Sequence, residues 1–353
     1  MWLTLKEPDL AKVCVMTTGG TISSIYDDKI QAYRPGLDLE SLLSTLPKEF
    51  QSIDVVKRQL FQIDSANAQP HHWKEIVSAV REIHEEIPDL DGFVILHGTD
   101  TMVYSATAMS FMVQDFGKPI IFTGSQIPAS IPWSDGPRNL VDALRVAAWG
   151  DVAETCIVFN GEIHRANRTR KIRERALDAF DSVDGTPMGF LARDIALYEN
   201  RKHRHNLPPK FDTRLNEMVF LLKVFPGMKP SIITKIVKMG YQGIVIEGFG
   251  SGNIPTKENG LTGTIKQALD NEVVVVMSTQ CAFGQADLSL YEVGKAAKDV
   301  GALSAYDMTS EAAVVKLMWI LAHTRNREKV REMMYTNYAG EITFSDVVGL
   351  LGS

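Results

Sequence analysis

The segment Val13–Thr21, with the sequence VCVMTTGGT, decides the fold of this chain. Its first four residues are apolar and predict a short buried strand. The strand leads into Thr17 and Thr18, and the chain then turns at Gly19 and Gly20. Paired glycines allow unusual backbone conformations and let a ligand approach the main chain closely. The segment therefore has two interpretations: a nucleophilic hydroxyl presented at a strand end, or an ordinary turn after the first strand.

Length and composition describe a globular chain that is long enough for two domains. It has 353 residues, of which 45% are hydrophobic and 23% are charged, and its formal net charge is −6. A negative charge argues against a general nucleic-acid binder, which needs a basic face. The three cysteines are far apart and predict neither a disulfide framework nor a zinc site. No apolar run approaches the roughly 18 residues that span a bilayer, so we expect a cytoplasmic protein without a membrane partner.

Short β-branched segments alternate with longer amphipathic ones, which predicts an α/β fold with a mostly parallel sheet flanked by helices. Residues 1–199 are predicted as a larger N-terminal domain and residues 218–353 as a smaller C-terminal α/β domain. The polar, proline-bearing residues 200–217 are predicted as the linker between them. In the first domain, residues 23–36 are predicted as an irregular surface flap and residues 102–116 as a helix.

Polar residues follow several of the predicted strands directly. They are Thr18, Ser65, Thr99 with Asp100, and Lys171. Because the carboxyl ends of parallel strands meet at one edge of a sheet, we expect these side chains to lie close together. A threonine hydroxyl becomes a good nucleophile only when a base removes its proton, and a lysine with a lowered pKa can do so. The combination of hydroxyl, carboxylate and amine therefore favours acyl-transfer chemistry.

Other chemistries have weaker support in the sequence. Gly248, Gly250 and Gly252 alternate but do not fit the Gly-x-Gly-x-x-Gly pattern of dinucleotide sites, and Pro255 interrupts the helix that such a motif needs. The eight histidines include no His-x-x-x-His pair with carboxylates, so no metal site is expected. The Gly-x-Ser-x-Gly motif of serine hydrolases is absent. We expect neither a cofactor nor a metal.

Six segments, in this order along the chain, resemble the bacterial-type L-asparaginases. Two of them resemble the threonine signatures of that family, and the last two resemble its intracellular, type I branch. The six are Thr18–Ile22, Asp64–Ser65, His97–Met102, Ser134–Leu140, Asn167–Lys171 and Thr279–Cys281. The resemblance extends from about residue 12 to residue 340 and implies the two-domain asparaginase-like fold.

The resemblance also implies a role for each matching residue. Thr18 would be the nucleophile that forms an acyl-enzyme, and Thr99, Asp100 and Lys171 would form a second catalytic group. Asp100 would bind the substrate's α-amino group. The turn of Asp64, Ser65 and Ala66 would bind its α-carboxylate, and Asn253 would reach the site across a subunit interface. The implied activity is hydrolysis of L-asparagine to L-aspartate and ammonia, with weak glutaminase activity, in a homodimer or homotetramer.

The family's catalytic tyrosine lies in the mobile flap. Tyr33, which is followed by Arg34 and Pro35, fits its spacing and context better than Tyr26. Where the secreted branch of the family has a glutamate, this chain has Phe283, which implies a different contact with the substrate's amino group. Some intracellular members bind asparagine as an effector beside the Thr-Gln-Cys segment, so Cys281 implies an allosteric site. Alternatively, Cys281 is a small residue that packs at a strand end.

Three other functions remain as alternatives. A related asparaginase-like chain serves as one component of a tRNA-dependent amidotransferase; the lack of an added N-terminal domain and of a broad basic face in the sequence argues against it. An inactive asparagine sensor is disfavoured by the intact Thr18, Thr99, Asp100 and Lys171. A lysophospholipid hydrolase is disfavoured because no amphipathic helix with a basic face is evident.

Overall fold

The computed structural model describes residues 10–44, 53–183 and 186–343. Contacts between residues divide the chain into two compact units, formed mainly by residues 10–182 with 186–213 and by residues 214–343. The division therefore falls inside the predicted linker, residues 200–217. Residues 200–213 belong to the first unit, where the Arg204 guanidinium donates hydrogen bonds to the carbonyls of Ala147, Gly150 and Asp91.

The first unit is built on one eight-stranded sheet. Its order is β13 (Ile195–Leu197), β12 (Gly189–Leu191), β9 (Glu162–Arg165), β8 (Thr155–Phe159), β7 (Ile120–Thr123), β5 (Gly92–Leu96), β1 (Ala11–Gly19) and β4 (Ile53–Ile63). Strands β4, β1, β5, β7 and β8 are mutually parallel, whereas β9, β12 and β13 are antiparallel to their neighbours. The mostly parallel sheet of the prediction is confirmed.

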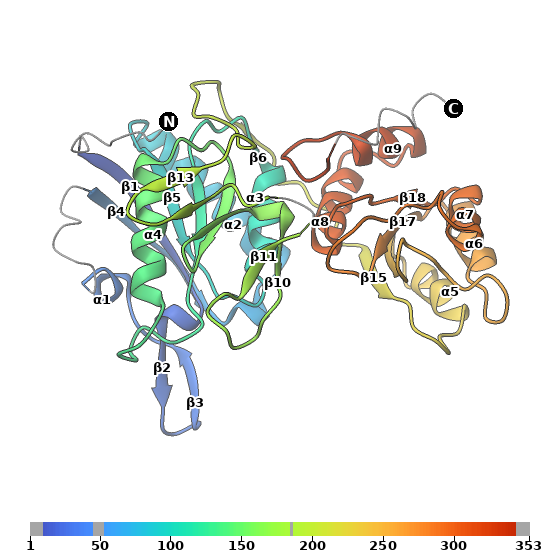
Figure 1. The fold of residues 1–353 in the computed structure, drawn as a ribbon, viewed down its shortest axis with the longest axis horizontal. Coiled ribbons are helices and arrows are strands. Elements are labelled where there is room, and N and C mark those ends of the chain that lie inside the picture. The colour runs from blue at the N-terminus through green and yellow to red at the C-terminus, as the bar shows by residue number, and fades with distance from the viewer. Residues whose placement is uncertain (1–9, 45–52, 184–185, 344–353) are drawn as a thin grey trace. The chain divides into compact units, whose positions relative to one another are not determined.

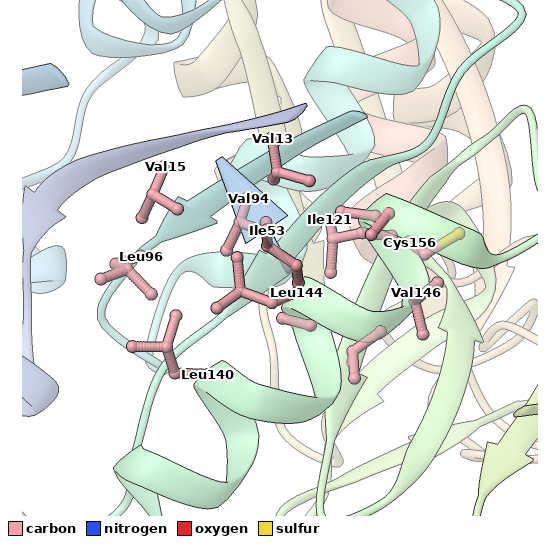
Figure 2. Close-up of a cluster of buried hydrophobic side chains, with 14 of the residues drawn as sticks. Val13, Val15, Ile53, Val94, Leu96, Ile121, Leu140, Leu144, Val146 and Cys156 are labelled. Carbon is pink, nitrogen blue, oxygen red and sulfur yellow. The ribbon is translucent and has the colours of Figure 1, made fainter. Parts of the chain in front are cut away.

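Helices cover both faces of this sheet, as its apolar strands require. Helices α1 (Leu39–Leu43) and α4 (Gly136–Trp149) lie on one side, and α2 (Pro70–Glu86) and α3 (Met102–Met112) lie on the other (Figure 1). Figure 2 shows the core beneath α4, where Val15, Leu96 and Ile121 from the strands face Leu140 and Leu144 from the helix. These side chains are almost completely buried, so they fix α4 against the strand ends that it follows.

The prediction of a helix over residues 102–116 is wrong at its C-terminal end. Helix α3 ends at Met112, and strand β6 (Val113–Gln114) follows, paired antiparallel with β14 (Lys210–Phe211). Asp115 then takes a left-handed conformation with φ of 54°. The apolar pattern of the segment suits a helix, but pairing with a strand about 95 residues away, across which Lys210 bonds Asp115, determines the observed structure.

Two hairpins were not predicted from the sequence. The flap contains β2 (Ser24–Asp27) paired antiparallel with β3 (Ala32–Pro35), so its predicted irregular structure is corrected to a hairpin, which projects from the first unit (Figure 1). A second hairpin joins β10 (Thr169–Lys171) to β11 (Phe180–Ser182). Both have polar sequences without clear alternation, which explains why the sequence did not indicate them.

The second unit contains a parallel four-stranded sheet. Its order is β15 (Val219–Lys223), β16 (Gly243–Gly248), β17 (Val274–Thr279) and β18 (Leu303–Ser304). Helices α5 (Ser231–Lys238), α6 (Thr262–Asp270) and α7 (Glu292–Asp299) pack on one face, and α8 (Ser310–Leu321) and α9 (Arg327–Tyr335) lie on the other (Figure 1). The predicted smaller α/β domain is confirmed. In the described residues, no helix is both long and apolar enough to cross a membrane.

Candidate active site

A crevice is expected in the first unit where the chain changes direction across the sheet. Strand β1 continues to β4 on one side of itself, whereas β5 continues through α3 to β7 on the other side. Ligands of open α/β sheets bind at the carboxyl ends of strands at such a switch point. The carboxyl ends of β1 and β5 carry Thr18 and Thr99. The sheet order therefore places the two predicted catalytic threonines on adjacent strands.

Three of the predicted segments meet at two glycines. Gly20 has φ of 85°, and a Cβ there would lie 2.4 Å from the Cα of Gly98. A Cβ on Gly98 would in turn lie 2.5 Å from Oγ of Ser65. Only residues without a side chain allow backbones to approach this closely. The glycines therefore bring the Thr18, Ser65 and Thr99 segments together, so they have a packing role beyond their service to the flap.

Thr18 is held at the end of β1 by its neighbour strand. Its Oγ1 donates a hydrogen bond to the carbonyl of Leu96, the last residue of β5, at 3.0 Å. The side chain is 2% exposed, and its neighbour Thr17 is turned to accept a bond from the N–H of Gly19. The structure thus fixes the hydroxyl of Thr18 beside the β5 end but does not hydrogen-bond it to Thr99 or Lys171.

Thr99, Asp100 and Lys171 form one contact cluster. Lys171 Nζ donates to Thr99 Oγ1 at 2.8 Å and to Asp100 Oδ1 at 2.7 Å. Thr99 is buried, the carboxylate of Asp100 is largely exposed, and Lys171 lies between them. Lys171 is the last residue of β10 in the unpredicted hairpin, and it does not follow a strand of the main sheet as its sequence position suggested. The cluster nevertheless has the expected composition of hydroxyl, carboxylate and amine.

Gln126 is a member of this cluster that sequence reasoning missed. Thr99 Oγ1 donates to Gln126 Oε1 at 3.1 Å, and Gln126 Nε2 donates to the carbonyls of Glu174 and Ala176. The backbone N–H of Gln126 donates to the carboxylate of Asp135. Its position after a predicted strand was the available signal. Because Thr99 donates to Gln126, its oxygen accepts the proton of Lys171, and the three side chains form a directed chain of hydrogen bonds.

The Asp64–Ala66 turn is rigid and lies beside the Thr99 segment. Asp64 caps a short 3₁₀-helix and accepts a bond from the N–H of Ala66 at 2.8 Å. Thr101 Oγ1 donates to the carbonyl of Ser65 at 2.7 Å. These bonds fix the turn close to the end of β5, which is the position expected for a group that binds one end of a substrate.

His97 lies behind the Thr99 segment and is neutral at physiological pH. Burial lowers the pKa of this imidazole to about 4, and the side chain is 2% exposed. Its Nδ1 faces the carbonyl of Gly98 at 2.7 Å and its Nε2 faces the hydroxyl of Ser105 at 2.9 Å. Since a carbonyl can only accept, Nδ1 carries the proton and Nε2 accepts from Ser105. The ring thereby fixes the turn between Gly98 and Thr99.

Two buried histidines predict a loss of stability in mild acid. Burial also lowers the pKa of His164 to about 4, whereas an unfolded histidine titrates near about 6.5. Between about pH 4 and 6.5 the unfolded chain therefore binds protons that the folded chain does not. We expect the stabilisation to be complete above this window and to decrease by up to about 3 kcal/mol per histidine as the pH falls through it.

Urea titrations at pH 7 and pH 5 measure this effect for the wild type and for His164→Gln. The variant should lose less stability between the two pH values than the wild type. An equal loss in both proteins would contradict the assignment of His164 as a group that resists protonation.

Both flap tyrosines lie on the hairpin and are about half exposed. Tyr26 and Tyr33 are directly opposite each other in the β2–β3 ladder, and their rings make an edge contact at 5.3 Å between centroids. Arg34 forms an ion pair with Asp27 across the same hairpin. Neither tyrosine hydroxyl hydrogen-bonds Thr18, Thr99 or Lys171 in the described structure. The choice between Tyr33 and Tyr26 stays a prediction.

The remaining predicted residues belong to the second unit. Asn253 closes a tight turn by two backbone bonds with Phe249, and its Oδ1 is buried without a hydrogen-bond partner among the described residues. Cys281 is exposed, and its N–H donates to Thr279 Oγ1 at 3.0 Å. The side chain of Phe283 is also exposed. The roles of Asn253 and Cys281 stay predictions.

The described part of the chain contains no group of three or more His, Cys, Asp or Glu side chains arranged to hold a metal ion. The candidate chemistry therefore rests on the side chains of the first unit themselves.

Comparison with known families identifies the chain. Residues 12–203 match the family model "Asparaginase, N-terminal", and residues 218–334 match "Glutaminase/Asparaginase C-terminal domain". The chain belongs to the asparaginase family and is an asparaginase-type amidohydrolase.

Its relatives include proteins of two kinds. The chain is 38% identical to the D-type subunit of the glutamyl-tRNA(Gln) amidotransferase of Pyrococcus abyssi, over 96% of this chain and 78% of the relative. It is 36% identical to an L-asparaginase of Thermococcus kodakarensis, over 95% and 100% of the two chains.

Solved structures of similar proteins confirm the fold. The thermostable L-asparaginase of Thermococcus kodakarensis has a TM-score of 0.88 at 35% identity, with 95% of this chain and all of that chain covered. L-asparaginase I of Vibrio cholerae has a TM-score of 0.84 at 32% identity, with 95% and 99% covered. The expected resemblance to asparaginases, including type I, is therefore confirmed.

Proposed function

We propose that this protein hydrolyses L-asparagine to L-aspartate and ammonia through an acyl-enzyme on Thr18. The observation that carries the proposal is the contact of Lys171 with both Thr99 and Asp100, on the strand next to Thr18. Amide hydrolysis needs a nucleophile, a route for protons and a polar grip on the substrate. The first unit offers all three within the ends of neighbouring strands.

The proposed reaction has two steps that balance. Thr18 Oγ1 attacks the side-chain carbonyl carbon of asparagine, the C–N bond breaks, and the protonated nitrogen leaves as ammonia. Water then attacks the resulting ester, which releases aspartate and restores the hydroxyl of Thr18. We propose that Lys171 and Thr99 transfer protons, with Gln126 orienting the Thr99 hydroxyl, and that Tyr33 closes over the substrate from the flap.

Substrate recognition is proposed for two groups of opposite character. The Asp64–Ala66 turn would hold the α-carboxylate through its Ser65 hydroxyl and backbone, and the exposed carboxylate of Asp100 would hold the α-amino group. Asn253 would complete the site from a second copy of the chain in a homodimer or homotetramer. Cytoplasmic location, weak glutaminase activity and an effector site at Cys281 belong to the same proposal.

A second candidate function follows from the relatives. Several glutamyl-tRNA(Gln) amidotransferase subunits are 34–38% identical to this chain over almost its whole length. In that role the same site would release ammonia for transfer to glutamyl-tRNA in a complex with another protein. Both functions use the same hydrolytic step, so the site geometry supports them equally.

Steady-state ammonia release distinguishes the two functions. Under the first proposal the purified chain alone hydrolyses L-asparagine with a kcat of about 1 per second or more, and much faster than L-glutamine. Under the second, turnover is slow until glutamyl-tRNA and the other amidotransferase component are added. Absence of ammonia release under both conditions would contradict both functions.

A further inference from the structure

The second unit contains a cavity of about 340 Å³ at the amino ends of β17 and β18. It lies far along these strands from their carboxyl ends, which carry Thr279, Cys281 and Phe283. Helix α6 contributes Leu269 to its wall and helix α9 contributes Val330 (both helices are labelled in Figure 1). Small-molecule sites in proteins usually have volumes of about 300–1,000 Å³. The cavity is therefore large enough for a small ligand.

The inner wall of the cavity is apolar. Leu269, Val274 and Val330 are almost completely buried, and Leu303 of β18 is half-buried. An apolar surface of this kind favours an apolar body of matching size and gives no partner to a fully polar molecule.

The rim of the cavity carries two arginines, Arg325 and Arg327, beside the start of α9. Neither guanidinium forms a hydrogen bond or ion pair with any residue that the structure describes. Nη2 of Arg327 lies 3.3 Å from the position of a Cβ on Gly301, which also lines the cavity. Arg327 is therefore turned toward the cavity and not away into solvent. Guanidinium groups bind carboxylates through paired hydrogen bonds.

One carboxylate, Glu272, also lines the rim, so the two arginines and this group together leave a net charge of +1. This balance matches a monoanion better than a dianion, and the apolar wall matches a hydrocarbon body. We propose that the cavity binds a small monocarboxylate with a branched or aromatic apolar body. This site is separate from the candidate active site and does not depend on the proposed function.

Isothermal titration calorimetry of the full chain with 4-methylpentanoate tests the proposal. For a ligand of this size we expect a Kd of about 0.1–10 mM. Acetate, which lacks the apolar body, and 4-methylpentanamide, which lacks the charge, should each bind at least about tenfold more weakly. L-aspartate should not displace 4-methylpentanoate, because it belongs to the candidate active site.

Variants locate the binding. The double variant Arg325→Gln/Arg327→Gln should raise the Kd at least about tenfold, and Leu303→Phe should weaken binding by filling the cavity. Arg331→Gln, on the same helix outside the cavity lining, is the matched control and should bind like the wild type. Thermal unfolding and ammonia release check that the variants are folded. Equal affinity in the wild type and the double arginine variant, displacement by L-aspartate, or no saturable binding would overturn the proposal.

Discussion

Thr18→Ala is expected to lower the rate of asparagine hydrolysis by a factor of about 10³ or more, because the acyl-enzyme cannot form without its hydroxyl. The substitution removes one hydrogen bond, to the carbonyl of Leu96, and should change stability by only about 1 kcal/mol. Ammonia release and thermal unfolding measure the two effects separately. Thr17→Ala is the matched control, since its hydroxyl bonds only the local N–H of Gly19 among the described residues.

Near-normal turnover by Thr18→Ala would remove Thr18 as the nucleophile. The proton-transfer chain is tested by Thr99→Val, Lys171→Met and their combination. Because the two side chains share one hydrogen bond and act as a unit, the double variant should be hardly slower than the slower single variant. Losses that multiply would show that Thr99 and Lys171 act independently.

Lys316→Met is expected to destabilise the second unit by about 3–5 kcal/mol, since it leaves a buried carboxylate without its counter-charge. Lys316 on α8 and Glu341 form an ion pair of 2.6 Å in which both side chains are completely buried. Lys316 Nζ also donates to the carbonyls of Met334 and Thr336, and Glu341 accepts from the N–H of Ala339 at 2.7 Å. The pair therefore ties the segment after α9 to α8.

Circular dichroism should detect this loss as a fall of about 10 °C or more in the unfolding temperature of the second unit. The double variant Lys316→Met/Glu341→Leu removes both charges and should recover most of the stability, because well-packed apolar side chains replace buried ion pairs at little cost. A double variant as unstable as Lys316→Met would mean that the backbone hydrogen bonds, and not the charge balance, hold this segment. The exposed pair Lys266–Asp270 is the control and should change stability by less than about 1 kcal/mol when broken.

The sequence predicted the parts of the fold that depend on local pattern. Apolar runs such as Gly92–Leu96 and Thr155–Phe159 coincide with the observed β5 and β8, because a strand buried on both faces must be apolar throughout. The two threonine segments follow such strands, so their position at the edge of the sheet could be inferred before the sheet was seen. Pattern failed at residues 113–116, where pairing with β14 ends the helix early.

Tertiary structure alone decided which side chains meet. Lys171 contacts Thr99 across 72 positions of sequence, and it does so from a hairpin that no periodicity indicated. Gln126 joins them because β7 neighbours β5, and the order of strands is not written in either strand. Lys316 and Glu341 look like surface charges until α8 and the segment after α9 enclose them. By itself the sequence determined the strands, the turns and the hydroxyls at their ends, because these follow from local sterics and burial. The contacts that could make Thr18 and Thr99 reactive depend on chain segments that only folding brings together.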